Sequence, residues 1–234
     1  MSGDFENLQL PPSFSGIVRL FPLPNLVLFP GVIQPLHIFE QRYRQMIEDA
    51  LAADELIAIA LMKPGWEPHY EGRPSIHETV CIGRIMTHSR LEDGRFNLLL
   101  QGLQRGKLVR EIATDRLYRM AEVSVPSSIS SIPNNKLLAL VARVQKDFMQ
   151  LCERDSMLDE DAIQCLLGDG LRLESIADLI AFSLNAEPLV KQQVLNSEDL
   201  ATRLRIVLQQ IRRQLNQEPT NQQASAFPPC FSSN

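Results

Sequence analysis

The sequence has no uninterrupted apolar run of the roughly 18 residues that a membrane-spanning helix needs, so we expect no membrane span. It also has no excess of positive charge. The 23 lysines and arginines are outnumbered by 28 aspartates and glutamates, giving a net charge of −5, which argues against a general nucleic-acid binder. Residues 1–9 carry acidic side chains and no basic one, so they lack the start of a secretory signal. The expected location is cytoplasmic.

Signatures of catalysis and metal binding are also missing. The four cysteines are too far apart to form a C-x-x-C site, and the four histidines show no H-E-x-x-H spacing. There is no G-x-S-x-G turn for an activated serine. The segment GLQRGK at 102–107 has one residue too few between its glycines for a phosphate-binding loop and lacks the following Ser or Thr, so we expect a strand-to-strand turn. The sequence predicts no metal, no cofactor, no catalytic residue and no enzyme.

What the sequence does have is an unusual run of prolines and apolar residues, FPLPNLVLFPG at 21–31, followed by PLHIFEQRY at 35–43. Each proline removes a backbone donor and fixes φ, so the run cannot be a long helix or a central strand. Short extended pieces joined by turns are expected, with Pro30-Gly31 as the clearest turn. A helix follows, because Phe39, Tyr43, Met46 and Ile47 recur at helical spacing.

The rest of the first half alternates between strand and turn signals. The run LIAIALM at 56–62 ends in Lys-Pro-Gly and predicts a strand buried on both faces. Asp93-Gly94 between extended arms predicts a hairpin. Further strands are expected from 80, over 107–112 and over 118–125. About six short strands with one inserted helix favour a closed or half-closed antiparallel barrel.

The second half is helical in pattern. A serine-rich, proline-bounded stretch at 126–133 reads as a linker. Leucine and valine positions after it predict a first helix from about 137 to 151, a helix capped by Ser175, and a long last helix capped by Asn196 or Ser197. The arginines of that last helix are expected on a solvated face. The predicted organisation is a flexible arm (1–14), a β-barrel (15–125), the linker (126–133), a helical subdomain (134–215) and a disordered tail (216–234).

These motifs together resemble the N-terminal substrate-binding domain of the ATP-dependent Lon proteases. The proline-rich run and PLHIFEQRY carry most of the specificity, and CIGRI at 81–85, DGRFNL at 93–98 and ADLIA at 177–181 follow in the family's order. The resemblance spans residues 17 to 215. It implies an α+β fold in which a PUA-like β pseudo-barrel is followed by a helical bundle. It also implies a role in recognising polypeptides, without the ATPase and peptidase segments of the protease.

One loop stands out as a candidate binding surface. The segment KPGWEPHYEG at 63–72 holds the only tryptophan, Trp66, together with His69 and Tyr70, between two prolines. Tryptophan and tyrosine dominate interface hot spots, because they bury a large area with few rotatable bonds. We therefore predict Trp66, His69 and Tyr70 as peptide-binding residues. The alternative is that Trp66 folds back as a lid over the end of the barrel.

The function predicted from the sequence is a non-enzymatic module that binds unfolded or exposed polypeptide segments, with a separate protease or chaperone as a further candidate partner. The alternative is an RNA-binding protein, since PUA-like barrels elsewhere bind RNA, but the net negative charge argues against nucleic acid as a partner.

Overall fold

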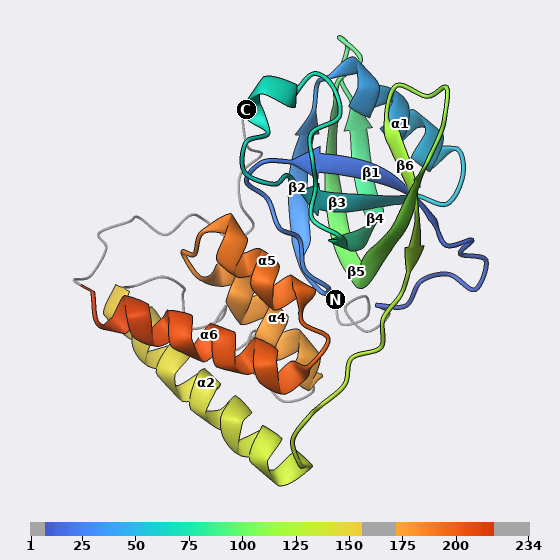
Figure 1. Ribbon diagram of the computed structural model, residues 1–234. Coiled ribbons are helices and arrows are strands. Elements are labelled where there is room, and N and C mark those ends of the chain that lie inside the picture. Colours follow the sequence, from blue (N-terminus) through green and yellow to red (C-terminus); the bar gives the residue numbers. More distant parts are fainter. Residues whose placement is uncertain (1–7, 156–171, 218–234) are drawn as a thin grey trace. The chain divides into compact units, whose positions relative to one another are not determined.

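The computed structural model describes residues 8–155 and 172–217. The described residues divide into two compact units, one ending at Pro126 and the other beginning at Ser127 (Figure 1). Residues 1–7 of the predicted arm and residues 218–234 of the predicted tail lie outside the described residues.

The first unit contains a six-stranded sheet in the order β2-β5-β4-β3-β1-β6, in which β6 also pairs with β5. Strands β5, β4, β3, β1 and β6 therefore form a closed ring. Its elements are β1 (Ile17–Leu23), β2 (Ile33–Ile38), helix α1 (Gln41–Leu51), β3 (Leu56–Leu61), β4 (Thr79–Arg90), β5 (Phe96–Ile112) and β6 (Arg119–Ser124).

The sheet is mixed, which corrects the expectation of an antiparallel barrel. Strand β1 pairs with β3 in parallel, with Leu20 opposite Ala58, while the other pairings are antiparallel. Two neighbouring parallel strands need a crossover connection between them. Here β2 and α1 lie between β1 and β3 in the sequence and provide that connection.

Strand β5 is a single strand of 17 residues. Residues 107–112 are extended, as predicted, but they continue the strand that begins at Phe96, so the turn predicted at 102–107 is wrong. Both segments lie within β5, whose first part pairs with β2 and β4 and whose last part pairs with β6. Glycine is common in turns, but Gly102 lies within this strand and allows another backbone to approach it closely.

Gly102 is where the proline-rich run reaches the sheet. Its backbone N–H donates to the Val32 carbonyl, and its own carbonyl accepts from the Gly31 N–H, both at 2.8 Å. A Cβ atom at residue 102 would lie 2.1 Å from the carbonyl oxygen of Phe29. Only glycine allows two backbones to approach this closely.

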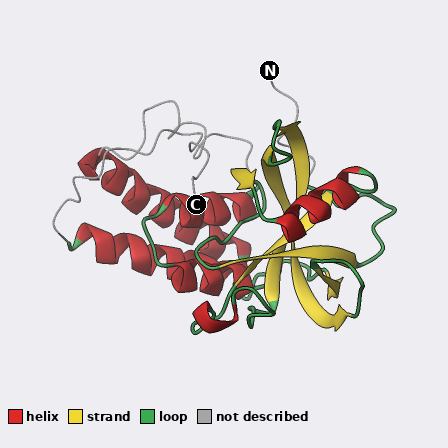
Figure 2. Cartoon of the chain, turned by 90° about the horizontal axis from the view of Figure 1, so that it is seen from above, coloured by secondary structure: helices red, strands yellow, loops and turns green. Residues whose placement is uncertain are grey.

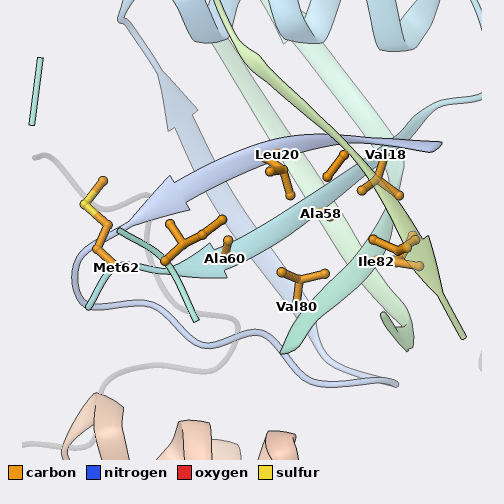
Figure 3. Close-up of a cluster of buried hydrophobic side chains, with 10 residues drawn as sticks. Val18, Leu20, Ala58, Ala60, Met62, Val80 and Ile82 are labelled. Carbon is orange, nitrogen blue, oxygen red and sulfur yellow. The ribbon is translucent and has the colours of Figure 1, made fainter. Parts of the chain in front are cut away.

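The interior of the ring is filled by alternate residues of its strands. Figure 3 shows Val18 and Leu20 of β1, Ala58 and Ala60 of β3, and Val80 and Ile82 of β4 gathered in one cluster. Their spacing of two residues follows from the alternation of side chains across a strand. Leu10 and Phe14, which precede β1, pack against the same cluster.

Three local predictions for this unit are confirmed. All six residues of β3 are buried, as expected of a strand covered on both faces. The Asp93-Gly94 turn joins β4 to β5, and Gly94 has a φ of +80°. Helix α1 buries Tyr43, Met46 and Ile47. Phe39 precedes that helix and is exposed, so it is not part of its buried face.

The second unit contains helices α2 (Asn134–Asp155), α4 (Leu173–Ser183), α5 (Pro188–Asn196) and α6 (Leu200–Leu215). Helix α6 contacts each of the other three and lies beside α2 along much of its length (Figure 1), and Figure 2 shows the helices of this unit in red. Its buried stripe includes Leu200, Leu204, Leu208 and Ile211, as the spacing predicts. No helix in the described ranges is long and apolar enough to cross a bilayer.

The predicted helix caps are wrong. The side chain of Asp199 caps α6 by accepting a hydrogen bond from the Thr202 N–H at 3.0 Å. Ser175 lies inside α4, which begins after Arg172. Asp199 also accepts from the Ser131 N–H and hydroxyl, so the cap ties the serine-rich segment to α6. Aspartate is a preferred N-cap residue, because its side-chain oxygen can accept from a free backbone N–H of the first helical turn.

The arginines of α6 do not all lie on a solvated face. Arg203 is only 1% exposed and forms an ion pair with the equally buried Asp178 of α4, with 3.4 Å between Nη1 and Oδ1. It also donates a hydrogen bond to the Ser128 hydroxyl. Arg203 is therefore part of the core of the second unit, where a charge is stable only when it is paired.

Candidate functional site

The loop that follows β3 is closed at its base. Met62 forms a β-bridge with Ile76, and the Lys63 N–H donates to the Ser75 carbonyl at 2.8 Å. Between these points the chain makes a short 3₁₀ turn, η1 (Glu67–His69), with Pro68 inside it. The His69 N–H donates to the Trp66 carbonyl and the Gly72 N–H to the His69 carbonyl, both at 2.9 Å. The loop is thus held in one compact conformation.

The loop brings two of the three predicted site residues together. The rings of Trp66 and Tyr70 meet edge to face, with 5.6 Å between their centroids. Both side chains are half-buried and pack against the apolar cluster inside the ring of strands. His69 lies between them in the sequence with its side chain exposed. The loop therefore presents an aromatic pair at the surface, supported from below by the core.

Tyr70 is anchored to the start of α1 through Glu40 and Arg42. Its hydroxyl donates to Glu40 Oε1 at 2.6 Å, and its carbonyl accepts from Arg42 Nη1 at 3.1 Å. Arg42 Nε in turn donates to Glu40 Oε2 at 2.9 Å. Three groups from two separate segments are thus joined in one hydrogen-bonded cluster.

Cation–π contacts reinforce this cluster. The guanidinium carbon of Arg42 lies 4.6 Å from the ring centroid of Tyr43 and 5.1 Å from that of Tyr70. Burial and the hydrogen bond to Glu40 raise the pKa of Tyr70 to about 12. The phenol therefore remains protonated at neutral pH and keeps donating to the carboxylate.

Glu40 and Arg42 were not predicted as site residues. Both residues appeared only within the PLHIFEQRY motif. No local pattern relates them to Tyr70, because the contact joins residues about 30 positions apart. The prediction that Trp66, His69 and Tyr70 bind peptide remains a prediction. Trp66 packs against the apolar cluster, as a lid would, and is also partly open to solvent, as a binding residue would be.

Within the described residues, little points to metal or phosphate chemistry. Among residues 8–155 and 172–217, no three His, Cys, Asp or Glu side chains come together in a group that could hold a metal ion. The GLQRGK segment is extended within β5, where its backbone pairs with β4. A phosphate loop would instead direct several backbone N–H groups at one point.

Comparison with known proteins gives the family. The ATP-dependent protease La (LON) substrate-binding domain family matches residues 17–213. The chain therefore belongs to the Lon substrate-binding domain family.

Curated relatives and solved structures agree with this assignment. Lon protease 2 of Myxococcus xanthus is 27% identical over 197 residues, which are 84% of this chain and 24% of that protein. Lon protease 2 of Bdellovibrio bacteriovorus is 27% identical over 210 residues, 88% of this chain and 25% of that protein. The chain thus spans about a quarter of the length of the curated relatives that it matches, and the match lies in the substrate-binding domain.

The fold is shared with isolated domains of the same kind. The N-terminal domain of Mycobacterium avium complex Lon protease superposes with a TM-score of 0.66 at 18% identity, covering 84% of this chain and 98% of that one. A Lon N-terminal domain protein from Xanthomonas campestris gives a TM-score of 0.57 at 21% identity, covering 82% of this chain and 97% of that one.

Proposed function

We propose that this protein is a non-enzymatic module that recognises unfolded or exposed polypeptide segments. The observation that carries the proposal is its membership of the Lon substrate-binding domain family over residues 17–213. Its curated relatives are proteases, and the chain matches about a quarter of their length. We propose that any degradation or remodelling of its clients is done by a separate protease or chaperone.

We further propose that Trp66, His69 and Tyr70 form the peptide-binding surface of this module. The support is local geometry: the two aromatic rings contact each other, and Tyr70 is bonded to Glu40. A surface that is already ordered loses little conformational entropy on binding. Half-exposed aromatic rings also gain apolar contact when a chain covers them.

At the level of architecture, we propose that the closed ring of strands with its inserted helix is a PUA-like pseudo-barrel. We also propose that α2, α4, α5 and α6 form a helical bundle. The pairing of β6 with both β1 and β5, and the contacts of α6 with the other three helices, support these assignments.

The test is the substitution Trp66→Ala, measured for both binding and stability. The client is a permanently unfolded protein, reduced and carboxyamidomethylated α-lactalbumin, titrated without ATP and compared with its folded form. Loss of a true aromatic anchor typically costs about 2 kcal/mol or more, which is about thirtyfold in affinity. We expect that loss with only a small change in melting temperature, because Trp66 is half-buried rather than part of the closed core.

Met86→Ala is the matched control, because Met86 is an exposed apolar residue on β4 of the same unit. It should leave binding unchanged. A wild-type protein that binds folded and unfolded client equally, or not at all, would contradict the proposed function. A large drop in melting temperature for Trp66→Ala with intact binding would show that Trp66 is a lid. A salt-sensitive complex with structured RNA, in place of client binding, would support the RNA-binding alternative.

A further inference from the structure

A pocket of about 220 Å³ lies in the first unit, next to the anchored loop. Twelve residues line it, and four of them are arginines that come from four different segments: Arg42 of α1, Arg73 of the loop, Arg116 of the segment before β6, and Arg119 of β6. None of the described lining residues is acidic. The fold therefore brings four guanidinium groups to one concave surface.

Arg119 and Arg42 are the less exposed of the four arginines, and hydrogen bonds hold both in place. Arg119 is 11% exposed and donates from Nε to Glu111 at 3.0 Å and from Nη1 to the Pro74 carbonyl at 2.7 Å. Arg42 is held by Glu40 and by the Tyr70 carbonyl. These bonds fix the orientation of the guanidinium groups, so the positive charge at the pocket is arranged before any ligand arrives.

Arg73 and Arg116 are the more exposed arginines, and both have N–H donors that a ligand could use. Arg73 is 62% exposed, and its nearest contact with Glu111 is 3.6 Å, longer than an N–H···O hydrogen bond. Arg116 is 48% exposed and forms an ion pair with Asp49, with 3.1 Å between Nη1 and Oδ2. A guanidinium carries five N–H donors, so both groups can also bind a second oxyanion.

The charges set what the pocket can accept. The carboxylates that pair with these arginines are Glu40, Asp49 and Glu111, and none of the three is among the residues that line the pocket. The four guanidinium groups are therefore paired with three carboxylates. An excess of one positive charge suits a ligand with a single negative charge, and paired guanidinium donors match the two oxygens of a carboxylate.

We infer that this pocket binds a carboxylate of the recognised polypeptide, either an acidic side chain or the chain's own C-terminus. Arg42 links the pocket to the aromatic pair, because it lines the pocket and also contacts the ring of Tyr70. A bound segment with an apolar residue on Trp66 and Tyr70 would place a nearby carboxylate at the arginines. The inference rests on the proposed function and adds to it a preference for a charged group beside an apolar one.

The experiment uses one short, unstructured, fluorescein-labelled peptide with two phenylalanines, made in matched forms. One pair differs in an internal Glu or Gln, and another pair differs in a free or amidated C-terminus. Affinity is measured by fluorescence anisotropy with the full chain. Hydrogen bonds to charged groups are strong enough that the carboxylate form should bind about tenfold more tightly in one of the two pairs. The pair that shows the preference identifies the source of the carboxylate.

The variant Arg73→Gln should reduce this preference severalfold, and adding Arg116→Gln should abolish it, while the uncharged peptide binds as before. Both side chains are at the surface, 62% and 48% exposed, so the variants should fold. Arg110→Gln is the control, because Arg110 is 69% exposed, pairs with Glu122 and lies outside the pocket. It should keep the full preference.

The outcomes separate this inference from the proposed function. Equal binding of all peptide forms, or an equal loss with Arg110→Gln and Arg73→Gln, would overturn the carboxylate pocket and leave polypeptide recognition intact. No binding of any peptide form to the wild-type protein would overturn both.

Discussion

The hydrogen bond between Tyr70 and Glu40 gives the most direct test of how the aromatic loop is held. The substitution Tyr70→Phe keeps the ring that contacts Trp66 and removes only the hydroxyl that donates to Glu40 at 2.6 Å. Hydrogen bonds to charged groups contribute about 1.5–3 kcal/mol, and partial exposure of Tyr70 places this bond near the lower end. A loss of about 1.5 kcal/mol corresponds to about a tenfold rise in the population of the open loop.

This opening should be local, because the loop carries its own backbone hydrogen bonds and the sheet remains paired without it. Amide hydrogen exchange is the suitable assay. The amides of His69 and Gly72 bond within the loop and should exchange about tenfold faster in Tyr70→Phe. The emission of Trp66 offers a second readout, since it is the only tryptophan in the chain.

Tyr118→Phe provides the matched control. The Tyr118 hydroxyl donates to Asp49 of α1 at 2.7 Å rather than to a residue of the loop, so its removal should leave the exchange of His69 and Gly72 unchanged. If Tyr70→Phe left loop exchange at the wild-type rate, or accelerated every amide of the unit equally, the anchoring argument would be refuted.

Three further predictions concern the fold. Gly102→Ala should destabilise the first unit by several kcal/mol in urea unfolding, because its Cβ would meet the Phe29 carbonyl. Leu204→Asp should likewise destabilise the helical unit by several kcal/mol in urea unfolding, since it puts an unpaired charge in the core. Burial lowers the pKa of Lys191 from 10.5 to about 8, so the unfolded chain binds more protons between these values and stability rises with pH. From pH 7 to about 9.5, the free energy of unfolding of the wild type, measured by urea unfolding, should therefore rise by about 2 kcal/mol relative to that of Lys191→Met.

Features set by nearby residues could be predicted from the sequence. The buried run of β3, the hairpin at Asp93-Gly94 and the buried face of α1 each depend on a pattern within one segment. Features set by distant partners could not. The glycines of β5 looked like a turn because the sequence alone does not show that the carbonyl of Phe29 lies against Gly102.

The same distinction holds for charged residues. Arg203 lies between Leu200 and Val207 on the buried stripe of α6, and this spacing could have indicated that it is buried. Its partner Asp178 sits on another helix, so the pairing itself was not visible. In the candidate site, the sequence identified Trp66 and Tyr70 by residue type. It could not identify Glu40 and Arg42, whose role depends on the packing of α1 against the loop.

The pairing of β1 with β6 has a consequence for how the protein folds during synthesis. Ile17 lies opposite Glu122, so the first and last strands of the ring are more than 100 residues apart in the sequence. Contacts between such distant residues form slowly, because the entropy of closing a long loop is lost before the contact stabilises the chain. The ring cannot close until β6 has left the ribosome. Until then, the interior faces of β1 and β3 stay open to water, and the nascent chain is itself an exposed apolar polypeptide.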